Sequence, residues 1–184
     1  MSVAKWVYRF RGYLITPPVI FAIFWSRFET EAEFIWPLGI CLFAFGVGLR
    51  IWAQQHLHYR IKAHKTLTIT GPYSFVRNPI YIGNIMISIG AIVISELLWL
   101  VPLILIYYLG IYSLVIRYEE AHLLSKYGEP YRKYMADVPR WVPKALHLKE
   151  IRIINEYLRQ SIVAEIHCIL LVLPFILKEI IDRS

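Results

Sequence analysis

The chain has 184 residues, of which 58% are hydrophobic and only 18% are charged. A soluble domain of this size is about a quarter charged, so the composition excludes an ordinary water-soluble fold and favours a single domain that has lipid as its solvent. The net charge of +7 does not indicate nucleic-acid binding, because the basic residues lie beside apolar runs and form no arm or stripe; it suits a membrane surface.

The first apolar run, at residues 13–25, follows three basic residues near the amino terminus. A signal peptide has the same order of charge and apolarity. Here Pro17 and Pro18 interrupt the run and no cleavage site of small residues follows. We therefore expect a retained first segment that is short and kinked at its prolines.

Two longer apolar blocks come next. Residues 34–52 are long enough for one crossing of a hydrocarbon core, which takes about 20 residues. Arg50, near the end of this segment, is expected to snorkel to the interface. After a basic loop at residues 53–79, the block at residues 80–116 is too long for one crossing. Its interruption at Glu96 predicts a hairpin of two helices.

Residues 144–184 are expected to form a helical tail. The apolar part of this tail, residues 162–177, is short and contains ionisable residues and a proline. It is interpreted as a fifth, tilted span, as an interfacial helix, or as a helix packed against a partner, and its length slightly favours the interfacial form.

The positive charges predict which helix ends share a side of the membrane. With a cytoplasmic amino terminus, the basic residues of the motif regions are all cytoplasmic, and Arg27 alone remains in the outer loops ahead of the tail. We therefore predict an all-α, polytopic membrane bundle of four to five transmembrane helices with a cofactor pocket on the cytoplasmic side. Residues 1–184 form one integral membrane domain, with its motifs within about residues 46–143.

The first polar region begins with an alternating strip. Residues 66–70 alternate threonine with apolar side chains and lead into Gly71 and Pro72, which predicts an extended strip that ends in a tight turn. An extended strip leaves peptide N–H and C=O groups free for the edge of an adenine ring. An ordinary interhelical loop explains the same pattern.

The next apolar helix opens at Asn78 and Pro79. Asparagine suits the N-cap and proline the first helical position, so capping alone explains both residues. Arg77, at the helix entrance, is placed to pair with a carboxylate. Tyr81 and Asn84 lie one turn apart on one face, and Asn84 needs a polar partner within the span, most simply an interhelical hydrogen bond.

Glu119 and Glu120 follow the last apolar run. Adjacent helical residues lie about 100° apart around the axis, so the two carboxylates cannot share one role. One is expected to pair with Arg117 or another base on the loop. The other is expected to face the bundle, where a carboxylate is costly unless it binds a cation. A solvated helix end is the alternative, but polar and aromatic neighbours favour a site: Tyr118, His122, Tyr127, Tyr131 and Tyr134.

A metal site is not expected. His56 and His58 stand two residues apart, and no cysteine or carboxylate lies at zinc-ligand spacing around them. The sequence also contains no glycine-rich dinucleotide fingerprint, phosphate-binding loop or recognisable serine-hydrolase triad.

The two motif regions together resemble a known superfamily. The first contains Gly71-Pro72-Tyr73 and Arg77-Asn78-Pro79-Ile80-Tyr81-Ile82-Gly83. The second contains Glu119-Glu120, Tyr127-Gly128-Glu129-Pro130-Tyr131, Tyr134, Val138-Pro139-Arg140 and Pro143. In this order they are similar to the membrane methyltransferases that include isoprenylcysteine carboxyl methyltransferase and the related phospholipid N-methyltransferases, over about residues 46–143.

This resemblance implies a transferase that uses S-adenosyl-L-methionine, enclosed by the carboxy-terminal half of the chain and open to both cytosol and lipid. It implies an adenine side lined by Lys65, Thr66, Leu67 and Thr68. It implies contacts to the sugar and amino-acid parts from Tyr73, Asn78, Pro79, Ile80 and Tyr81. Glu119 takes the ammonium group of the cofactor, and His58 stands near a polar cofactor contact of the family.

Two positions depart from the family pattern. Asn78 stands where the eukaryotic members have histidine, and Val115 stands where they carry a substrate-side arginine, so a prenylcysteine substrate is not specifically implied. Arg117 is the basic residue nearest in sequence to Val115. Arg117 or Arg77 is expected to orient an acidic substrate. Glu120 or a nearby tyrosine is expected to accept a proton if the acceptor is an amine.

The predicted function is methyl transfer to a carboxylate, amine or thiol of a lipid-like or prenylated substrate at the membrane–cytosol interface. The protein is then a multi-pass membrane protein that contacts lipids and binds no nucleic acid; the sequence gives no oligomeric state. Two alternatives remain open. A non-catalytic membrane scaffold or lipid-binding protein binds no such cofactor, whereas an NADPH-dependent, sterol-reductase-like enzyme binds a nicotinamide.

Overall fold

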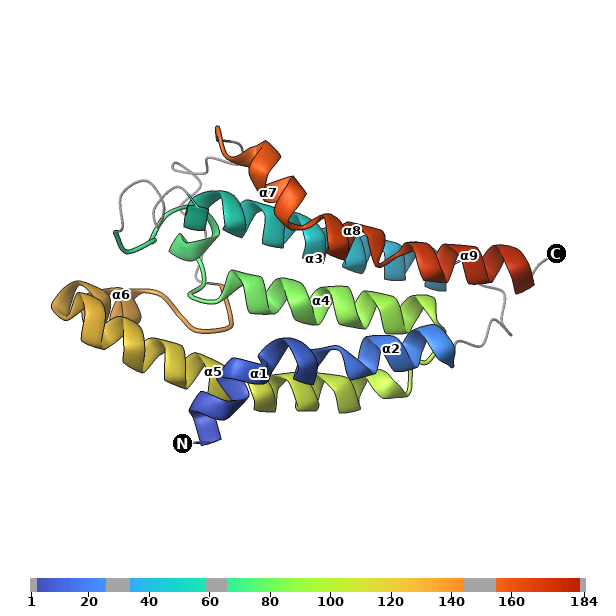
Figure 1. Ribbon diagram of the computed structural model, residues 1–184, viewed down its shortest axis with the longest axis horizontal. Helices are drawn as coiled ribbons and strands as arrows, with labels where there is room; N and C mark the ends of the chain where they lie inside the picture. Colours follow the sequence, from blue (N-terminus) through green and yellow to red (C-terminus); the bar gives the residue numbers. More distant parts are fainter. Residues whose placement is uncertain (1–2, 26–33, 59–65, 144–154, 183–184) are drawn as a thin grey trace.

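The computed structural model describes residues 3–25, 34–58, 66–143 and 155–182, and every regular element in those ranges is helical (Figure 1). In chain order the elements are α1 (Val3–Ile15), α2 (Pro17–Phe24), α3 (Ile35–His58), the 3₁₀ turn η2 (Gly71–Ser74), α4 (Pro79–Ile94), α5 (Leu100–Tyr127), α6 (Glu129–Asp137), α7 (Leu158–Ala164), α8 (Ile166–Leu170) and α9 (Leu173–Asp182). The predicted all-α class is confirmed.

Two described helices are long and apolar enough to cross a membrane alone, namely Ile35–Leu57 within α3 and Leu100–Tyr127. A third candidate is the pair Leu158–Ala164 and Ile166–Leu177, which bends by 53°. The apolar helix α4 is shorter, at 16 residues. The described residues therefore give two or three candidate spans by length and composition, and the predicted count of four to five stays a prediction.

The proline kink and the hairpin are confirmed. The first segment breaks at Thr16 between α1 and α2, because a proline at position 17 has no N–H to continue the helical ladder. The block at residues 80–116 turns between α4 and α5, and Glu96 has a φ of 59° in that turn. Helix α1 starts earlier than the expected segment, since Val3–Ile15 includes the basic residues ahead of the apolar run.

Two helices continue past the ends that hydropathy predicts. Helix α3 runs to His58, six residues beyond position 52, because Gln55 and His56 are buried against other parts of the chain and extend its packed face. Helix α5 runs to Tyr127, so Glu119 lies inside a helix and not at its end. Polar residues with good helix propensity prolong both helices after their apolar stretches stop.

Helices α3 and α4 are in direct backbone contact through glycines. A Cβ on Gly46 would lie 2.7 Å from the carbonyl oxygen of Gly83 and 2.8 Å from the nitrogen of Ile87. A Cβ on Gly90 would lie 2.6 Å from the nitrogen of Phe43. Small residues at such positions are typical of membrane helix pairs, in which close van der Waals packing drives association.

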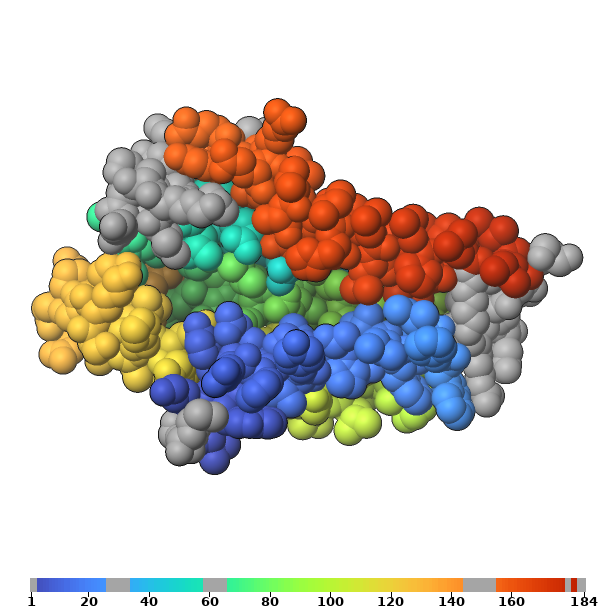
Figure 2. Space-filling view, viewed as in Figure 1, coloured from blue at the N-terminus to red at the C-terminus, as the bar shows by residue number. Residues whose placement is uncertain are grey.

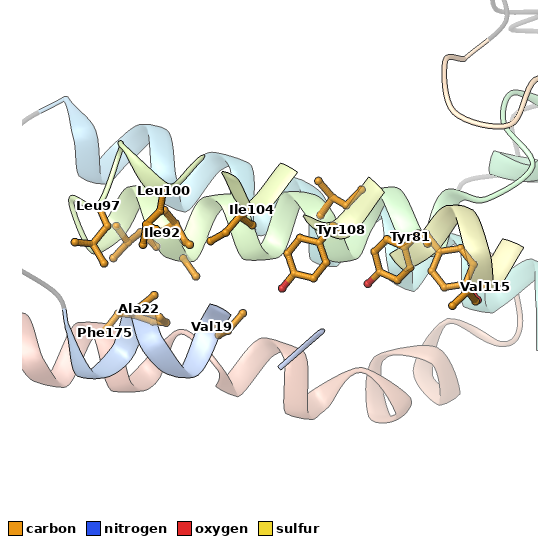
Figure 3. Packing of buried hydrophobic residues seen from close by; sticks show 14 of the residues in the cluster. Val19, Ala22, Tyr81, Ile92, Leu97, Leu100, Ile104, Tyr108, Val115 and Phe175 are labelled. Atoms are coloured by element: carbon orange, nitrogen blue, oxygen red, sulfur yellow. The ribbon is translucent and has the colours of Figure 1, made fainter. Parts of the chain in front are cut away.

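The other helices pack around this pair. The main apolar core lies between α4 and α5 on one side and α1 and α2 on the other, with Tyr108 and Phe175 among its buried members (Figure 3). The carboxy-terminal segment, α7–α9, lies along α3, where Ile169 and Val172 pack against Phe43 and Val47 (Figure 1). The expected helical tail is present in residues 158–182.

Both motif regions lie at one end of the bundle, as predicted. The carboxyl end of α3, the turn η2, the amino end of α4, the last turns of α5 and helix α6 meet there (Figure 1). The antiparallel order of α3, α4 and α5 produces this arrangement, because it returns the chain to the same end after each pair of helices.

Replacing Gly46 by alanine is expected to lower the free energy of unfolding by about 1–3 kcal/mol, because the new methyl group meets backbone atoms that cannot move aside. Gly48→Ala is the matched control, since a Cβ at that position meets nothing within 4 Å. Thermal unfolding of the purified proteins in detergent compares the two. Equal melting temperatures for both variants would contradict the close packing of α3 on α4.

Candidate functional site

The loop that follows α3 is fixed by a contact between Gly71 and His56. Gly71 has a φ of 61°, and a Cβ there would lie 2.4 Å from the imidazole of His56, so only glycine suits the position. The Nδ1 atom of His56 lies 3.0 Å from the hydroxyl of Thr70. These contacts hold the start of η2 against the end of α3.

The expected adenine strip leads into this turn. Residues 66–69 have no regular secondary structure, and Thr70 has the extended backbone that the alternation predicts, with φ −110° and ψ 167°. Thr66 is exposed, Leu67 is half-buried, and Thr68 is buried. The Thr68 hydroxyl has no hydrogen-bond partner among the described residues, so it is available to a ligand. The side chain of His58 and the whole of Lys65 lie outside the described residues.

Three buried tyrosines connect η2 to α6. The hydroxyl of Tyr134 donates a 2.7 Å hydrogen bond to the backbone carbonyl of Tyr73. Burial raises the pKa of the Tyr73 and Tyr134 phenols, and burial together with the charge of Glu120 raises the pKa of Tyr131 to about 12. All three are neutral donors near pH 7, which leaves none of them free to accept a proton there.

The predicted N-cap position of Asn78 is confirmed, but its side chain does not cap the helix. Asn78 occupies the N-cap position of α4 with Pro79 at the first helical position, but its side chain makes no capping bond. It donates 3.2 Å to the carbonyl of Arg140 instead. The reason is that the chain after α6 runs beside this helix start and offers an acceptor, while the N–H of Arg77 donates 2.9 Å to the carbonyl of Pro139. Pro79 is buried here, and Ile80 is half-buried.

Glu120 is held by two arginines. The Nε of Arg140 donates 3.1 Å to Glu120 Oε1, and its Nη2 also contacts the carboxylate. Arg77 lies 3.3 Å from Glu120 and donates 2.8 Å to the carbonyl of Met135. The expected pairing of one carboxylate with a loop base is confirmed. Arg117, the other base predicted for this pairing, is exposed on α5.

Glu119 faces the bundle, as the second carboxylate was expected to do. Its Oε1 accepts a 2.8 Å hydrogen bond from the hydroxyl of Tyr81, from α4. The ring of Tyr81 lies 4.6 Å, centroid to centroid, from that of Tyr112 on α5, and Figure 3 shows Tyr81 in line with Tyr108 between α4 and α5. Glu119 and Glu120 thus bind different partners, as their separation of about 100° around the helix axis predicts.

Helix α1 covers this part of α5. The rings of Tyr8 and Tyr118 lie 4.9 Å apart, and the guanidinium of Arg11 lies 4.3 Å from the centroid of Tyr8. The charge of Arg11 also acts on the carboxylate of Glu119. The basic residues ahead of the first apolar run predict only topology, and no local pattern indicates that Arg11 acts on Glu119.

A second polar network continues from the site between the helices. The expectation that Arg50 snorkels is wrong, because its Nε and Nη2 donate to the two oxygens of Glu165, at 2.8 and 3.0 Å. Its Nη1 contacts the side-chain oxygen of Asn84. The Nδ2 of Asn84 donates 2.9 Å to the hydroxyl of Tyr112, which confirms the predicted interhelical hydrogen bond.

One group of residues has ligand types that suit a metal ion. The donor atoms of Glu165, His167 and Cys168 lie within 4.8 Å of one another. However, both oxygens of Glu165 already accept hydrogen bonds from Arg50, and that positive charge opposes a second cation. The group therefore fits an ion pair better than a metal centre.

The fold and the site define a class of protein. Two of its described helices are long and apolar enough to cross a membrane alone, and at the motif-bearing end of the bundle the carboxylate of Glu119 accepts a hydrogen bond from Tyr81. The family model of phospholipid methyltransferases matches residues 34–130, just over half of the chain. The chain belongs to this family, which confirms the resemblance to the membrane methyltransferases.

Two curated proteins are similar to this chain at below 30% identity. The chain is 26% identical over 130 residues to the cobalt-zinc-cadmium resistance protein CzcN of Cupriavidus metallidurans, a match that covers 68% of this chain and 59% of that protein. It is 29% identical over 107 residues to the nickel-cobalt-cadmium resistance protein NccN of Alcaligenes xylosoxydans xylosoxydans, with 58% and 47% covered. The matches thus span about half the length of each relative. No solved structure matches the chain.

Replacing Glu120 by glutamine is expected to lower the free energy of unfolding by about 1–3 kcal/mol, because two half-buried arginines lose their shared counter-charge. Hydrogen exchange at residues 138–143 should accelerate as well. Glu129→Gln is the control, since Glu129 and Arg132 form an ion pair whose side chains are 75% and 68% exposed. Unchanged exchange in Glu120→Gln would contradict a structural role for this ion-pair cluster.

Proposed function

We propose that this protein transfers a methyl group from S-adenosyl-L-methionine to a lipophilic acceptor at the boundary between membrane and water. The family supplies the reaction class. The observation that carries the proposal is the inward-facing carboxylate of Glu119, hydrogen-bonded to Tyr81 at the end of the bundle where the motif loop lies.

A carboxylate in this position needs a cationic partner. A charge held between apolar helices is costly unless it is paired and hydrogen-bonded. Tyr81 fills one of about four acceptor positions on the Glu119 carboxylate. The ammonium group of an amino-acid moiety offers three donors and a positive charge, so it suits the remaining positions.

The adenine side is proposed to lie along residues 65–68, with His58 near it. The free hydroxyl of Thr68 and the extended backbone at Thr70 support this placement, because a flat heterocycle with donors and acceptors on its edge needs such groups. We place Tyr73, and the helix start with Asn78, Pro79 and Ile80, next to the sugar and amino-acid parts. These residues adjoin Tyr81 at the amino end of α4.

When bound, S-adenosyl-L-methionine supplies an electrophilic methyl group on a positively charged sulfur. The task of the protein is then to align the acceptor and keep water away. A carboxylate acceptor needs no base. For an amine acceptor, the role as proton acceptor that we expected of Glu120 is replaced by a positioning role, because Arg77 and Arg140 already hold it. Arg117, exposed on α5, remains placed to meet an acidic headgroup from the water side.

We further propose that α4 and the pair of α1 and α2 cross the membrane with the candidate spans, which gives the four to five crossings expected from sequence. Their axes run beside α3 and α5 in one bundle (Figure 1). The end that carries the site also carries Arg11, Arg77 and Arg140, and this excess of positive charge supports a cytoplasmic orientation.

Isothermal calorimetry in detergent with two ligands tests the role of Glu119. 5′-Methylthioadenosine keeps the nucleoside but lacks the amino-acid part. Glu119→Gln is expected to weaken binding of S-adenosyl-L-methionine about 10- to 100-fold, the worth of a hydrogen bond to a charged group, and to leave methylthioadenosine unchanged. Tyr81→Phe should produce a smaller loss, because it removes the hydroxyl that orients Glu119 and keeps both the ring and the carboxylate. Glu129→Gln is the exposed control.

The same experiment separates the alternatives. Equal losses for both ligands in Glu119→Gln would contradict a contact to the ammonium group. A wild-type protein that binds neither ligand would favour the non-catalytic scaffold, and binding of NADPH in their place would favour the reductase.

Transfer of a labelled methyl group identifies the acceptor class. The wild-type protein, incubated with a membrane lipid extract and methyl-labelled S-adenosyl-L-methionine, is expected to place label in the lipid fraction. Glu119→Gln should lose most of this activity at low cofactor concentration and regain part of it at high concentration, because its defect is in binding. Label that mild alkali releases as volatile methanol indicates a methyl ester, and hence a carboxylate acceptor. Label that alkali does not release as methanol indicates an amine or a thiol.

A further inference from the structure

Arg50 is a charged residue that the proposed cofactor contacts leave unused. It lies within a candidate membrane span, and its side chain is 12% exposed, while that of its partner Glu165 is 1% exposed. Ion pairs of this kind are expensive to bury, and apolar pairs often replace them without loss of stability. Ionisable residues within membrane spans therefore usually mark a ligand path.

The geometry of the pair is that of an anion-binding fork. The Nε and Nη2 atoms of Arg50 donate in parallel to the two oxygens of Glu165. The same fork binds carboxylates and phosphates of ligands in two-pronged fashion. Asn84 contacts the third nitrogen and so holds the guanidinium in place without neutralising it.

The two halves of the pair come from different parts of the molecule. Arg50, Asn84 and Tyr112 belong to the stretch that the family model matches, whereas Glu165 lies beyond it in the carboxy-terminal segment. That segment bends by 53° at Glu165, where α7 ends and α8 begins. The segment lies along α3 at the surface, and α4 shows only as a narrow strip between it and α1 and α2 (Figure 2).

The fork is connected to the proposed reaction site. Asn84 lies one helical turn after Tyr81, and Tyr112 contacts both, through its hydroxyl to Asn84 and through its ring to Tyr81. Tyr81 in turn donates to Glu119. A headgroup held by Arg50 therefore lies deeper between the helices than Glu119 but on the same chain of contacts.

We propose that Arg50, in place of the exposed Arg117, is the anion-binding residue of the acceptor site, and that Glu165 occupies it as an internal substitute for the acidic headgroup of a lipid. The methyl acceptor is then a lipid whose headgroup carries an anionic group, either a carboxylate or a phosphate. Such a ligand displaces Glu165 from Arg50, the charge on the guanidinium stays neutralised, and the carboxy-terminal segment moves outward at its bend. The link to methyl transfer rests on the proposed function, but binding at Arg50 does not.

Binding is tested without any cofactor, on the full chain in neutral detergent. The probe is cis-parinaric acid, followed by energy transfer from the tryptophans, and its methyl ester is the uncharged control ligand. Glu165→Gln is expected to raise the affinity for the acid about tenfold or more, because it removes the competing carboxylate, and to leave the ester unchanged. Glu129→Gln should alter neither, since its ion pair is exposed.

A second variant protects the test from a folding failure. The double change Arg50→Met and Glu165→Met replaces the ion pair by apolar side chains and is expected to fold, as a thermal unfolding curve will show. It should bind acid and ester equally well. A preference for the acid that survives in this variant, or a Glu165→Gln protein that binds the acid no better than wild type does, would overturn the proposal.

Competition then assigns the headgroup. Displacement of the probe by palmitate but not by lysophosphatidic acid identifies a carboxylate site, and the reverse identifies a phosphate site. If neither palmitate nor lysophosphatidic acid displaces the probe, the proposal is wrong. If Arg50 binds anionic lipids while S-adenosyl-L-methionine fails to bind, the methyltransferase function is wrong and the lipid site remains.

Discussion

The close contact between α3 and α4 determines how the buried polar side chains between these two helices meet. Because Gly46, Gly83 and Gly90 let the two backbones touch, Arg50 on one helix reaches Asn84 on the other. The same contact places the end of α3 beside the start of α4, and the loop between them closes through Gly71 on His56. In lipid, where apolar side chains gain little by leaving the solvent, backbone proximity and interhelical hydrogen bonds must supply this order.

Much of the architecture could be predicted from the sequence. The proline kink, the hairpin at Glu96 and the different partners of Glu119 and Glu120 all follow from local rules on proline, hydropathy and helical periodicity. Such rules work because each depends on residues within one or two turns of each other.

The predictions that the structure contradicts depend on residues far apart in sequence. The side-chain partner of Asn78 and the ion pair of Arg50 differ from the predictions because the deciding partners lie far away in sequence. Asn78 bonds to a residue 62 positions later, and Arg50 to one 115 positions later. No local pattern announces that a distant acceptor or carboxylate will be present, although a lone arginine inside an apolar helix does signal that some partner must exist.

The length of helix α5 fixes the distance between its first residue and Glu119. It is unbroken from Leu100 to Tyr127, so Glu119 stands about 30 Å from its first residue at 1.5 Å per residue. That distance equals the thickness of a typical hydrocarbon layer. In a thinner bilayer the helix either tilts or places the carboxylate among the lipid headgroups. In a thicker bilayer the carboxylate lies within the hydrocarbon core. Under the proposed topology, the thickness of the surrounding hydrocarbon layer therefore sets the depth at which this carboxylate lies.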